Sequence, residues 1–152
     1  MSRGERFMMA KPRFGERPPR YTFVLNPYTD YRFTRCPNCD QPTRLRKFVL
    51  FIHVDPDHLL SMGKTCRFCP KCEWLIAHQD EVEAELANLF SRLDPKAIGN
   101  DYLIVGTVDR QVWREGLQHP KTINEVLPHV ADFKDVRRVE VRPAGWYPVD
   151  ES

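Results

Sequence analysis

The clearest periodic pattern in the chain lies in residues 80–93, where apolar side chains recur at spacings of four and three. The apolar positions are Val82, Leu86, Leu89, Phe90 and Leu93. This spacing places them on one face of an α-helix, and carboxylates in the first turns interact favourably with the helix dipole. Asp94-Pro95 then ends the helix, because proline has no backbone N–H. The pattern predicts an amphipathic helix that packs on a sheet.

Three strands are predicted before this helix. Residues 48–52 are apolar at five consecutive positions, and such a run requires cover on both faces of a sheet. We therefore expect a long strand over residues 43–54, ended by the turn Asp55-Pro56-Asp57. Shorter strands are expected over residues 59–65 and 73–77, on either side of a cysteine-rich stretch.

The last third of the chain has the pattern of a strand, a helix and a strand. Residues 102–108 form an apolar run, and residues 136–142 alternate valine with charged side chains, as a half-exposed strand does. Between them, Thr122-Ile123-Asn124-Glu125 has the form of a capping box and predicts a helix that continues to about Phe133. Residues 80–152 are therefore expected to form a helix plus a β-α-β segment that share one core.

The first 20 residues differ from the rest of the chain in composition. They contain six lysines or arginines, three prolines and two glycines, without a sustained hydrophobic period. This composition predicts a basic N-terminal arm in residues 1–20. Four large apolar side chains between residues 7 and 14 favour docking of the arm on its own domain.

Length and composition limit the class of protein. With 152 residues, of which 41% are hydrophobic, the chain can form one domain with its own core. Trp113 and the segment Gly145-Trp146-Tyr147-Pro148 are expected to belong to this core rather than to a ligand site. No apolar run approaches the roughly 18 residues of a membrane span, and the N-terminus lacks the apolar stretch of a signal peptide. We therefore expect a cytoplasmic protein.

Four of the five cysteines lie in two short motifs, Cys36-Pro37-Asn38-Cys39 and Cys69-Pro70-Lys71-Cys72. Two Cys-x-x-Cys motifs supply the four thiolates that tetrahedral Zn²⁺ takes in a closed structural site. The proline after the first cysteine of each motif suits the sharp turn of a zinc knuckle, because its fixed φ pre-sets the bend. The expected ligands of one structural zinc ion are Cys36, Cys39, Cys69 and Cys72.

The second cluster contains three cysteines, and the residue that follows a knuckle indicates which two of them form it. In a knuckle this residue often has positive φ and a free N–H. If Cys66 and Cys69 formed the knuckle, the residue would be Pro70, which provides neither. If Cys69 and Cys72 form it, the residue is Glu73. The corresponding residue of the first motif is Asp40, and aspartate tolerates the left-handed region well.

With two Cys-Pro-x-Cys knuckles, the chain resembles the zinc-ribbon class over roughly residues 31–78. The resemblance implies two β-hairpins pinned by one zinc ion, so residues 21–79 are expected to be the ribbon of an α+β protein. Two features depart from the class: no glycine follows either knuckle, and 29 residues separate Cys39 from Cys69. The long insertion costs about 1 kcal/mol or less, since loop-closure entropy grows only logarithmically.

Other cysteine chemistries fit the sequence less well. A disulfide framework suits a secreted chain with an even number of cysteines, and thioredoxin-like chemistry needs one motif within a βαβ unit. Rubredoxin-type iron uses similar knuckles, so spacing alone leaves iron open as an alternative to zinc. Cys66 is expected to be a buried, inert thiol. The alternatives for Cys66 are a reactive thiol activated by Lys64 and Arg67, or a ligand that exchanges with Cys69.

Charge is distributed unevenly along the chain. Residues 1–50 contain eleven Lys or Arg against four Asp or Glu, a balance of +7, whereas residues 51–152 come to −5 and the whole chain to +2. The basic cluster near the knuckles either neutralises the metal site or faces the phosphates of a nucleic acid. The candidate nucleic-acid contacts are Arg13, Arg17, Arg20, Arg32, Arg35, Arg44, Arg46 and Lys47.

These features predict a structural-zinc protein that acts as a nucleic-acid-binding module, with RNA or a ribonucleoprotein as the expected partner. Zinc ribbons commonly bind nucleic acid. Arginines interleaved with the aromatic residues Tyr21, Phe23, Tyr28, Tyr31 and Phe33 offer charge together with stacking surface. The alternative is a protein–protein adaptor without nucleic-acid contact, in which these aromatic residues belong to the core or to an interface.

One stretch resembles a catalytic metal motif. His53-Val54-Asp55-Pro56-Asp57-His58 is similar to the His-x-His-x-Asp-His motif of metallo-β-lactamase-type enzymes, with Asp55 in place of the second histidine. This replacement removes one ligand, and the sequence offers no convincing downstream ligands. We therefore expect no enzymatic activity, and a metal-dependent hydrolase is the remote alternative.

Overall fold

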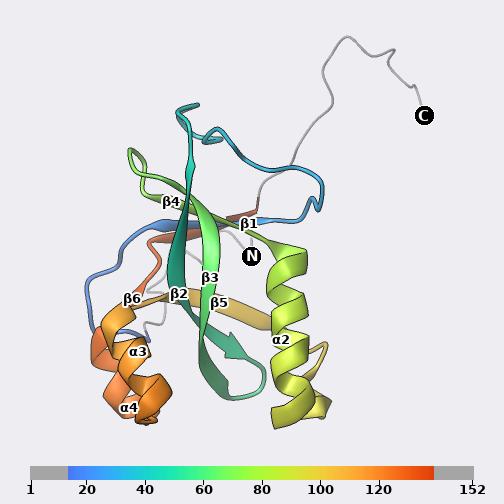
Figure 1. Cartoon of the computed structure of the whole chain (residues 1–152), viewed down its shortest axis with the longest axis vertical. Helices are drawn as coiled ribbons and strands as arrows, with labels where there is room; N and C mark the ends of the chain where they lie inside the picture. The colour runs from blue at the N-terminus through green and yellow to red at the C-terminus, as the bar shows by residue number, and fades with distance from the viewer. Residues whose placement is uncertain (1–13, 139–152) are drawn as a thin grey trace, which may run out of the picture.

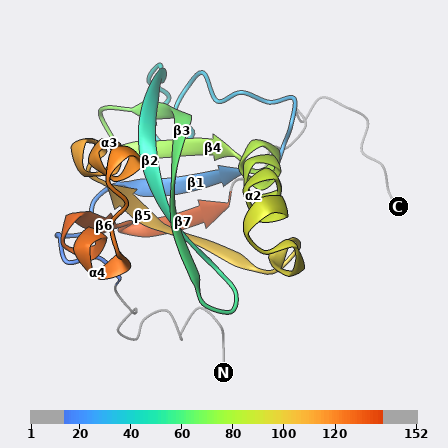
Figure 2. The same cartoon turned by 60° about the horizontal axis from the view of Figure 1, so that its bottom comes forward.

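A curled, mixed sheet of seven strands forms the framework of the protein, in a computed structural model that describes residues 14–138 (Figures 1 and 2). The strands are β1 (Thr22–Asn26), β2 (Arg44–Val54), β3 (His58–Cys69), β4 (Trp74–His78), β5 (Tyr102–Val108), β6 (Val130–Asp132) and β7 (Asp135–Arg138). Their order in the sheet is β6-β5-β2-β3-β4-β1-β7. β2 and β3 form a long antiparallel hairpin, whereas β1 runs parallel to both β4 and β7. The protein is thus a mixed α+β structure.

The sheet curls because its two edge strands are neighbours in the chain. Phe133 and Lys134 alone separate β6 from β7. The N–H of Phe133 donates to the carbonyl of Val105, and the N–H of Lys134 donates to the carbonyl of Tyr21, both at 2.8 Å. The buried Phe133 ring stacks on Phe23 with the ring centroids 5.0 Å apart. The two residues that connect the edge strands are therefore hydrogen-bonded both to β5 and to the residue that precedes β1.

The apolar run of β2 is buried on both faces of the sheet, as predicted. Phe48, Leu50 and Ile52 belong to the main core cluster. Val49 and Phe51 belong to a second cluster, against which Trp113 and other side chains of the following helices pack. Figure 1 accordingly shows α2 (Gln79–Leu93) on one side of the β2–β3 hairpin, and α3 (Arg110–Gln118) and α4 (Ile123–Val126) on the other.

The helix expected over residues 80–93 is confirmed as α2. Its buried residues are Val82, Leu86 and Phe90, which are the centre of the predicted apolar face. Leu93 was expected on the same face but is 66% exposed as the last residue of the helix. The helix ends at Asp94, and the 3₁₀ turn η1 (Pro95–Ala97) follows.

The helix expected from the capping box to about residue 133 is wrong beyond its first turn. The capping box itself forms, with reciprocal hydrogen bonds between Thr122 and Glu125. However, α4 ends at Val126, the 3₁₀ turn η2 (Leu127–His129) follows, and β6 begins at residue 130. Pro128 cannot continue a helix because it has no backbone N–H. Since β6 pairs antiparallel with β5, the last third is not the simple β-α-β unit that we expected.

The sequence pattern predicts neither β1 nor α3. β1 has five residues and depends on two parallel partners that are distant in the chain. α3 has nine residues and buries none of its side chains; it begins where the Asp109 carboxylate accepts hydrogen bonds from the N–H groups of Gln111 and Val112. Within residues 14–138, no helix has both the length and the apolar character needed to cross a membrane.

The segment 14–20 docks along β6. The N–H of Gly15 donates to the Asp132 carboxylate at 2.7 Å, and the N–H of Arg17 donates to the Val130 carbonyl at 3.0 Å. The N–H of Arg20 donates to the Asp132 carbonyl at 2.9 Å. This part of the arm therefore packs on its own domain.

The aromatic segment 145–148 and the end of the strand expected over residues 136–142 lie outside the described residues.

Candidate metal centre and basic groove

Two tight turns bring four cysteines together at one end of the molecule. The Sγ atoms of Cys36, Cys39, Cys69 and Cys72 all lie within 4.8 Å of one another. In a tetrahedral site with Zn–S bonds of about 2.3 Å, the sulfur atoms are about 3.8 Å apart. The spacing and the all-thiol donor set fit one metal ion with four protein ligands, which suggests structural zinc binding.

The two turns have the same backbone geometry. The N–H of Asp40 donates to the Cys36 carbonyl and the N–H of Glu73 donates to the Cys69 carbonyl, both at 2.8 Å. Asp40 and Glu73 have φ values of 64° and 57°, so the expected positive φ after each knuckle is confirmed. In each turn a backbone N–H also points at the first sulfur, from Asn38 at 3.4 Å and from Cys72 at 3.5 Å.

Hydrogen bonds also join the two turns to each other. The side-chain amide of Asn38 donates to Cys72 Sγ at 3.3 Å and so links the first turn to the second. Burial raises the pKa of the Cys36 thiol to about 12. A coordinated metal ion opposes this effect, since its charge favours the thiolate.

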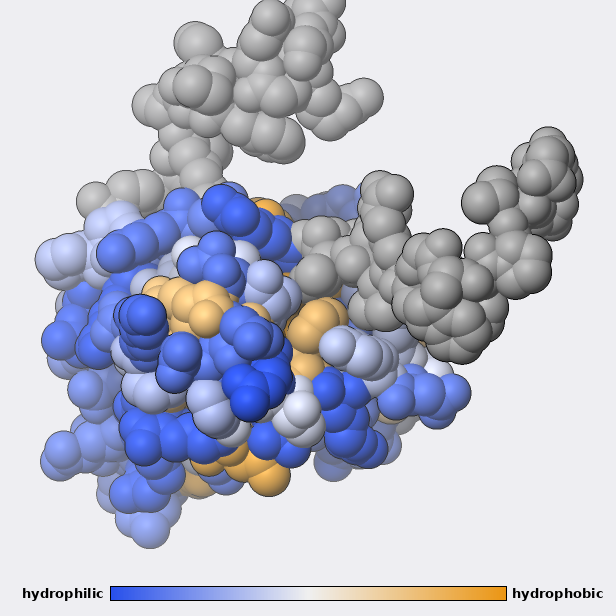
Figure 3. Space-filling model, turned by 90° about the horizontal axis from the view of Figure 1, so that it is seen from above, coloured by the Kyte–Doolittle hydropathy of each residue, from blue (hydrophilic) through white to orange (hydrophobic). Residues whose placement is uncertain are grey.

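The end of the molecule that carries the turns is mostly hydrophilic, with small separated hydrophobic patches (Figure 3).

Different scaffolds carry the two turns. The second turn joins β3 to β4, and Cys69 pairs with Trp74 across this hairpin. The first turn lies in a loop whose sides meet at the isolated bridge between Arg35 and Pro42. Phe33 anchors this loop in a small buried cluster with residues of β1 and β4. The observed strands therefore do not establish the two-hairpin architecture of a zinc ribbon.

Cys66 is separated from the four-cysteine cluster. It is 1% exposed and belongs to the main core. Its Sγ lies 3.6 Å from the Lys64 carbonyl, and burial raises the pKa of the thiol to about 12. The structure thus places Cys66 as a buried thiol with little thiolate character.

A basic groove of about 640 Å³ lies between segment 17–21, β2, the end of β5 and the start of α3. Six of its lining residues are Lys or Arg, and Asp109 is the one carboxylate among them. The cationic residues are Arg17, Arg20, Arg46, Lys47, Arg110 and Arg114. Four of these were candidate nucleic-acid contacts. Arg110 and Arg114 were missed because more than 60 residues separate them from the others in sequence.

Aromatic rings hold three of these cations over the groove. The Arg46 guanidinium lies 4.7 Å from the Phe48 ring centroid, and the Arg20 guanidinium lies 4.6 Å from that of Tyr21. Lys47 Nζ lies 5.2 Å from the Trp113 ring. The three cations therefore cover the faces of these rings.

The remaining candidate contacts lie elsewhere. Arg35 donates to the Asp40 carbonyl at 2.6 Å beside the metal centre, Arg32 and Arg44 do not line the groove, and Arg13 is outside the described residues. The expected stacking surface is largely wrong, because Tyr21, Phe23 and Phe33 are buried, Tyr28 is half-buried, and Tyr31 is the exposed member of the set.

The stretch that resembles a catalytic metal motif does not assemble a metal site. His53 Nδ1 lies 3.7 Å from an Asp55 oxygen, whereas His58 Nε2 faces Asp94 at 3.2 Å and packs against Phe90. Within residues 14–138, the four cysteines are the one cluster of side chains that could hold a metal ion.

Comparison of the chain with models of known protein families finds no match, and comparisons with curated proteins and with solved structures find none either.

Proposed function

We propose that this protein binds one structural zinc ion and uses its basic groove to bind nucleic acid, RNA in particular. The four-cysteine cluster supports the zinc assignment, because four protein ligands close a tetrahedral site and leave no position for a substrate. Elemental analysis of the purified protein tests it: one zinc per chain is expected, whereas stoichiometric iron would favour a rubredoxin-type centre.

The charge of the groove is the observation that carries the nucleic-acid proposal. Six cations and one carboxylate line a single concave surface. Arg20 is paired with Glu73 and Arg17 with Asp109, and the aromatic contacts hold Arg46 and Lys47 in place. An array of positioned cations fits the phosphate backbone, whose neutralisation releases counterions.

The groove favours phosphates over bases. The aromatic rings that a base could stack on are buried or lie beneath Arg20, Arg46 and Lys47. Base stacking and base-edge contacts provide sequence discrimination in RNA recognition, whereas phosphate contacts provide affinity. We therefore propose binding with weak sequence preference.

A salt titration tests the proposal. Binding of a labelled RNA hairpin and of a single strand of the same composition is measured by fluorescence anisotropy at several salt concentrations. Affinity should fall steeply with salt, and Lys47→Ala or Arg114→Ala should reduce the slope of log K against log salt by about 1 each. Arg92→Ala makes the same charge change on α2 and should leave the slope unchanged. No binding at low salt would exclude the proposal.

A further inference from the structure

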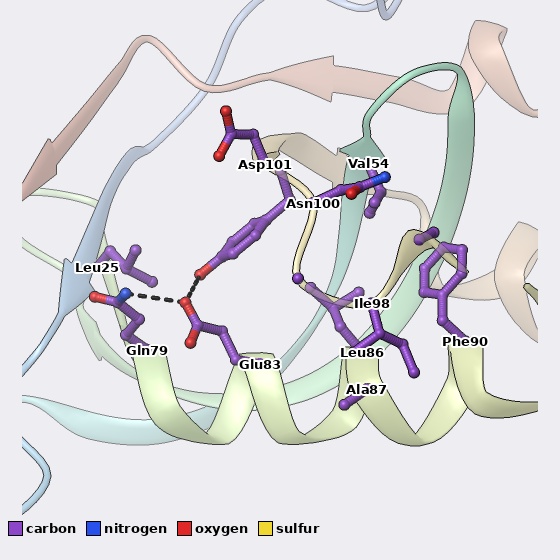
Figure 4. A pocket seen from close by; sticks show the side chains of 13 residues that line it. Leu25, Val54, Gln79, Glu83, Leu86, Ala87, Phe90, Ile98, Asn100 and Asp101 are labelled. Carbon is purple, nitrogen blue, oxygen red and sulfur yellow. Dashed lines mark hydrogen bonds between the residues drawn. The ribbon is translucent and has the colours of Figure 1, made fainter. Parts of the chain in front are cut away.

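A second concave site lies between α2 and the segment that leads into β5 (Figure 4). This cleft has a volume of about 600 Å³. Its walls are α2 and residues 97–102, and Leu25 of β1 and Val54 of β2 complete it. It shares no lining residue with the basic groove. The cleft therefore offers a binding site that is independent of the proposed nucleic-acid site.

One end of the cleft is apolar. Leu86 and Phe90 of α2 and Ala97 are buried there, and Ile98 beside them is 45% exposed. Figure 4 shows the side chains of Leu86, Ile98 and Phe90 grouped at this end. A cavity of this size with a mainly apolar lining and a few placed polar groups is typical of sites for small organic molecules.

A fixed carboxylate lies at the other end. Glu83 Oε2 accepts hydrogen bonds from the Tyr102 hydroxyl at 2.8 Å and from the Gln79 side-chain amide at 2.9 Å (Figure 4). Within residues 14–138, no hydrogen bond ends on the other oxygen, Oε1. The carboxylate is thus oriented by its neighbours while one oxygen remains able to accept a ligand donor.

The cleft is negatively charged. Glu83 and Asp101 line it, and no Lys, Arg or His is among the lining residues. The salt bridges of the described residues involve neither carboxylate. The cleft and the basic groove also lie at opposite ends of β5, since Tyr102 lines the first and Val108 the second. Six residue steps of a strand separate them by about 20 Å, so the charges of one site are screened from the other.

We propose that this cleft binds a small organic cation, in which an ammonium or guanidinium group is attached to an apolar body. The cationic group donates to Glu83 Oε1 beside Tyr102, and the apolar body covers Ile98 and the side chains around it. Phosphate-containing ligands are disfavoured because the lining carboxylates repel them. The ligand class is therefore opposite in charge to that of the basic groove.

Three probes with the same aromatic body test the charge preference. 2-Phenylethylamine, 2-phenylethanol and 3-phenylpropionate are titrated into the ¹⁵N-labelled, metal-loaded full chain, and amide shifts are followed by NMR. The amine should shift the resonances of Glu83, Ile98 and Tyr102 and bind about two- to fivefold more tightly than the alcohol, as expected for one exposed ion pair. The carboxylate should bind most weakly.

A matched pair of variants assigns the preference to one residue. Glu83→Gln retains the hydrogen-bonding shape and should equalise the affinities for the amine and the alcohol, whereas Glu85→Gln, a residue that does not line the cleft, should preserve the difference. Equal binding of the three probes by the unmodified chain would overturn the proposal. Absence of any cleft shift up to millimolar probe would overturn it as well.

Discussion

Three non-glycine residues of the described chain, Tyr21, Asp40 and Glu73, have positive φ. Asp40 and Glu73 occupy the same position in the two sulfur-binding turns, where the N–H must reach back to the carbonyl of the first cysteine. Tyr21 connects the groove segment to β1, and a bulky residue rarely adopts this conformation without a local cause. Among the non-glycine residues that the structure describes, positive φ is therefore confined to the metal centre and to the edge of the groove.

Replacement of Asp40 by glycine should stabilise the protein. A side chain in the left-handed region costs about 1 kcal/mol, and glycine removes this cost. The 4.0 Å pair with Arg35 is exposed and contributes little. We expect Asp40→Gly to raise the free energy of unfolding of the metal-loaded protein by up to about 1 kcal/mol, measured by urea denaturation. Asp40→Val should lower it, and equal stability of the two variants would contradict the assigned turn.

Cys66 should resist alkylation in the folded protein. Burial raises the pKa of its thiol to about 12, so the thiolate is scarce near neutral pH. Iodoacetamide at pH 8 followed by mass spectrometry should leave Cys66 unmodified until denaturant is added. Cys66→Ala should retain one metal ion per chain, whereas Cys69→Ser should lose it. Rapid modification of Cys66 in the native state would show instead that it is a reactive thiol.

At the scale of secondary-structure elements, prediction from sequence succeeds where the signal is local and fails where it depends on distant partners. The run at residues 48–52 and the period of α2 are strong local signals, and both elements form. β1 exists because β4 and β7 flank it, and no feature of residues 22–26 alone indicates those partners. The two cysteine turns are also predicted from a local signal, since the cysteine spacing and the proline position identify them before any fold is known.

The close approach of β5 and β6 requires glycine at position 106. A Cβ at Gly106 would lie 2.1 Å from the Ala131 carbonyl oxygen and 2.7 Å from the Asp132 Cα, which are backbone atoms of the paired strand. Gly106→Ala should therefore lower the free energy of unfolding by about 2 kcal/mol or more, measured by urea denaturation.

Gly116→Ala is the matched control for this change. Gly116 lies in α3, and a Cβ there would have no atom within 4 Å. The substitution should stabilise the protein by up to about 1 kcal/mol, because alanine is the better helix former. The same chemical change should thus have opposite signs at the two positions. Destabilisation at both would show that the β5–β6 contact is not the cause.

At the scale of the whole molecule, opposite charges collect at the two ends of β5. The sequence indicates this only as an excess of positive charge in residues 1–50. The groove itself needs Arg110 and Arg114 beside Arg46, a juxtaposition that follows from the pairing of β2 with β5 and not from spacing along the chain. The metal centre connects to the groove through Glu73, which pairs with Arg20 at 3.0 Å and accepts a hydrogen bond from the N–H of Thr22.

Removal of the metal should therefore weaken nucleic-acid binding even though no cysteine lines the groove. Without the ion, the turn that carries Glu73 loses its cross-link, and Arg20 loses its fixed partner. Treatment with a chelator should lower RNA affinity severalfold, and added zinc should restore it. Hydrogen exchange should increase in residues 20–22, 36–43 and 69–73 while β2 and β5 remain protected. Unchanged RNA affinity and salt slope in the metal-free protein would show that the sheet alone maintains the groove. Loss of hydrogen-exchange protection throughout the sheet would mean that the ion stabilises the entire fold.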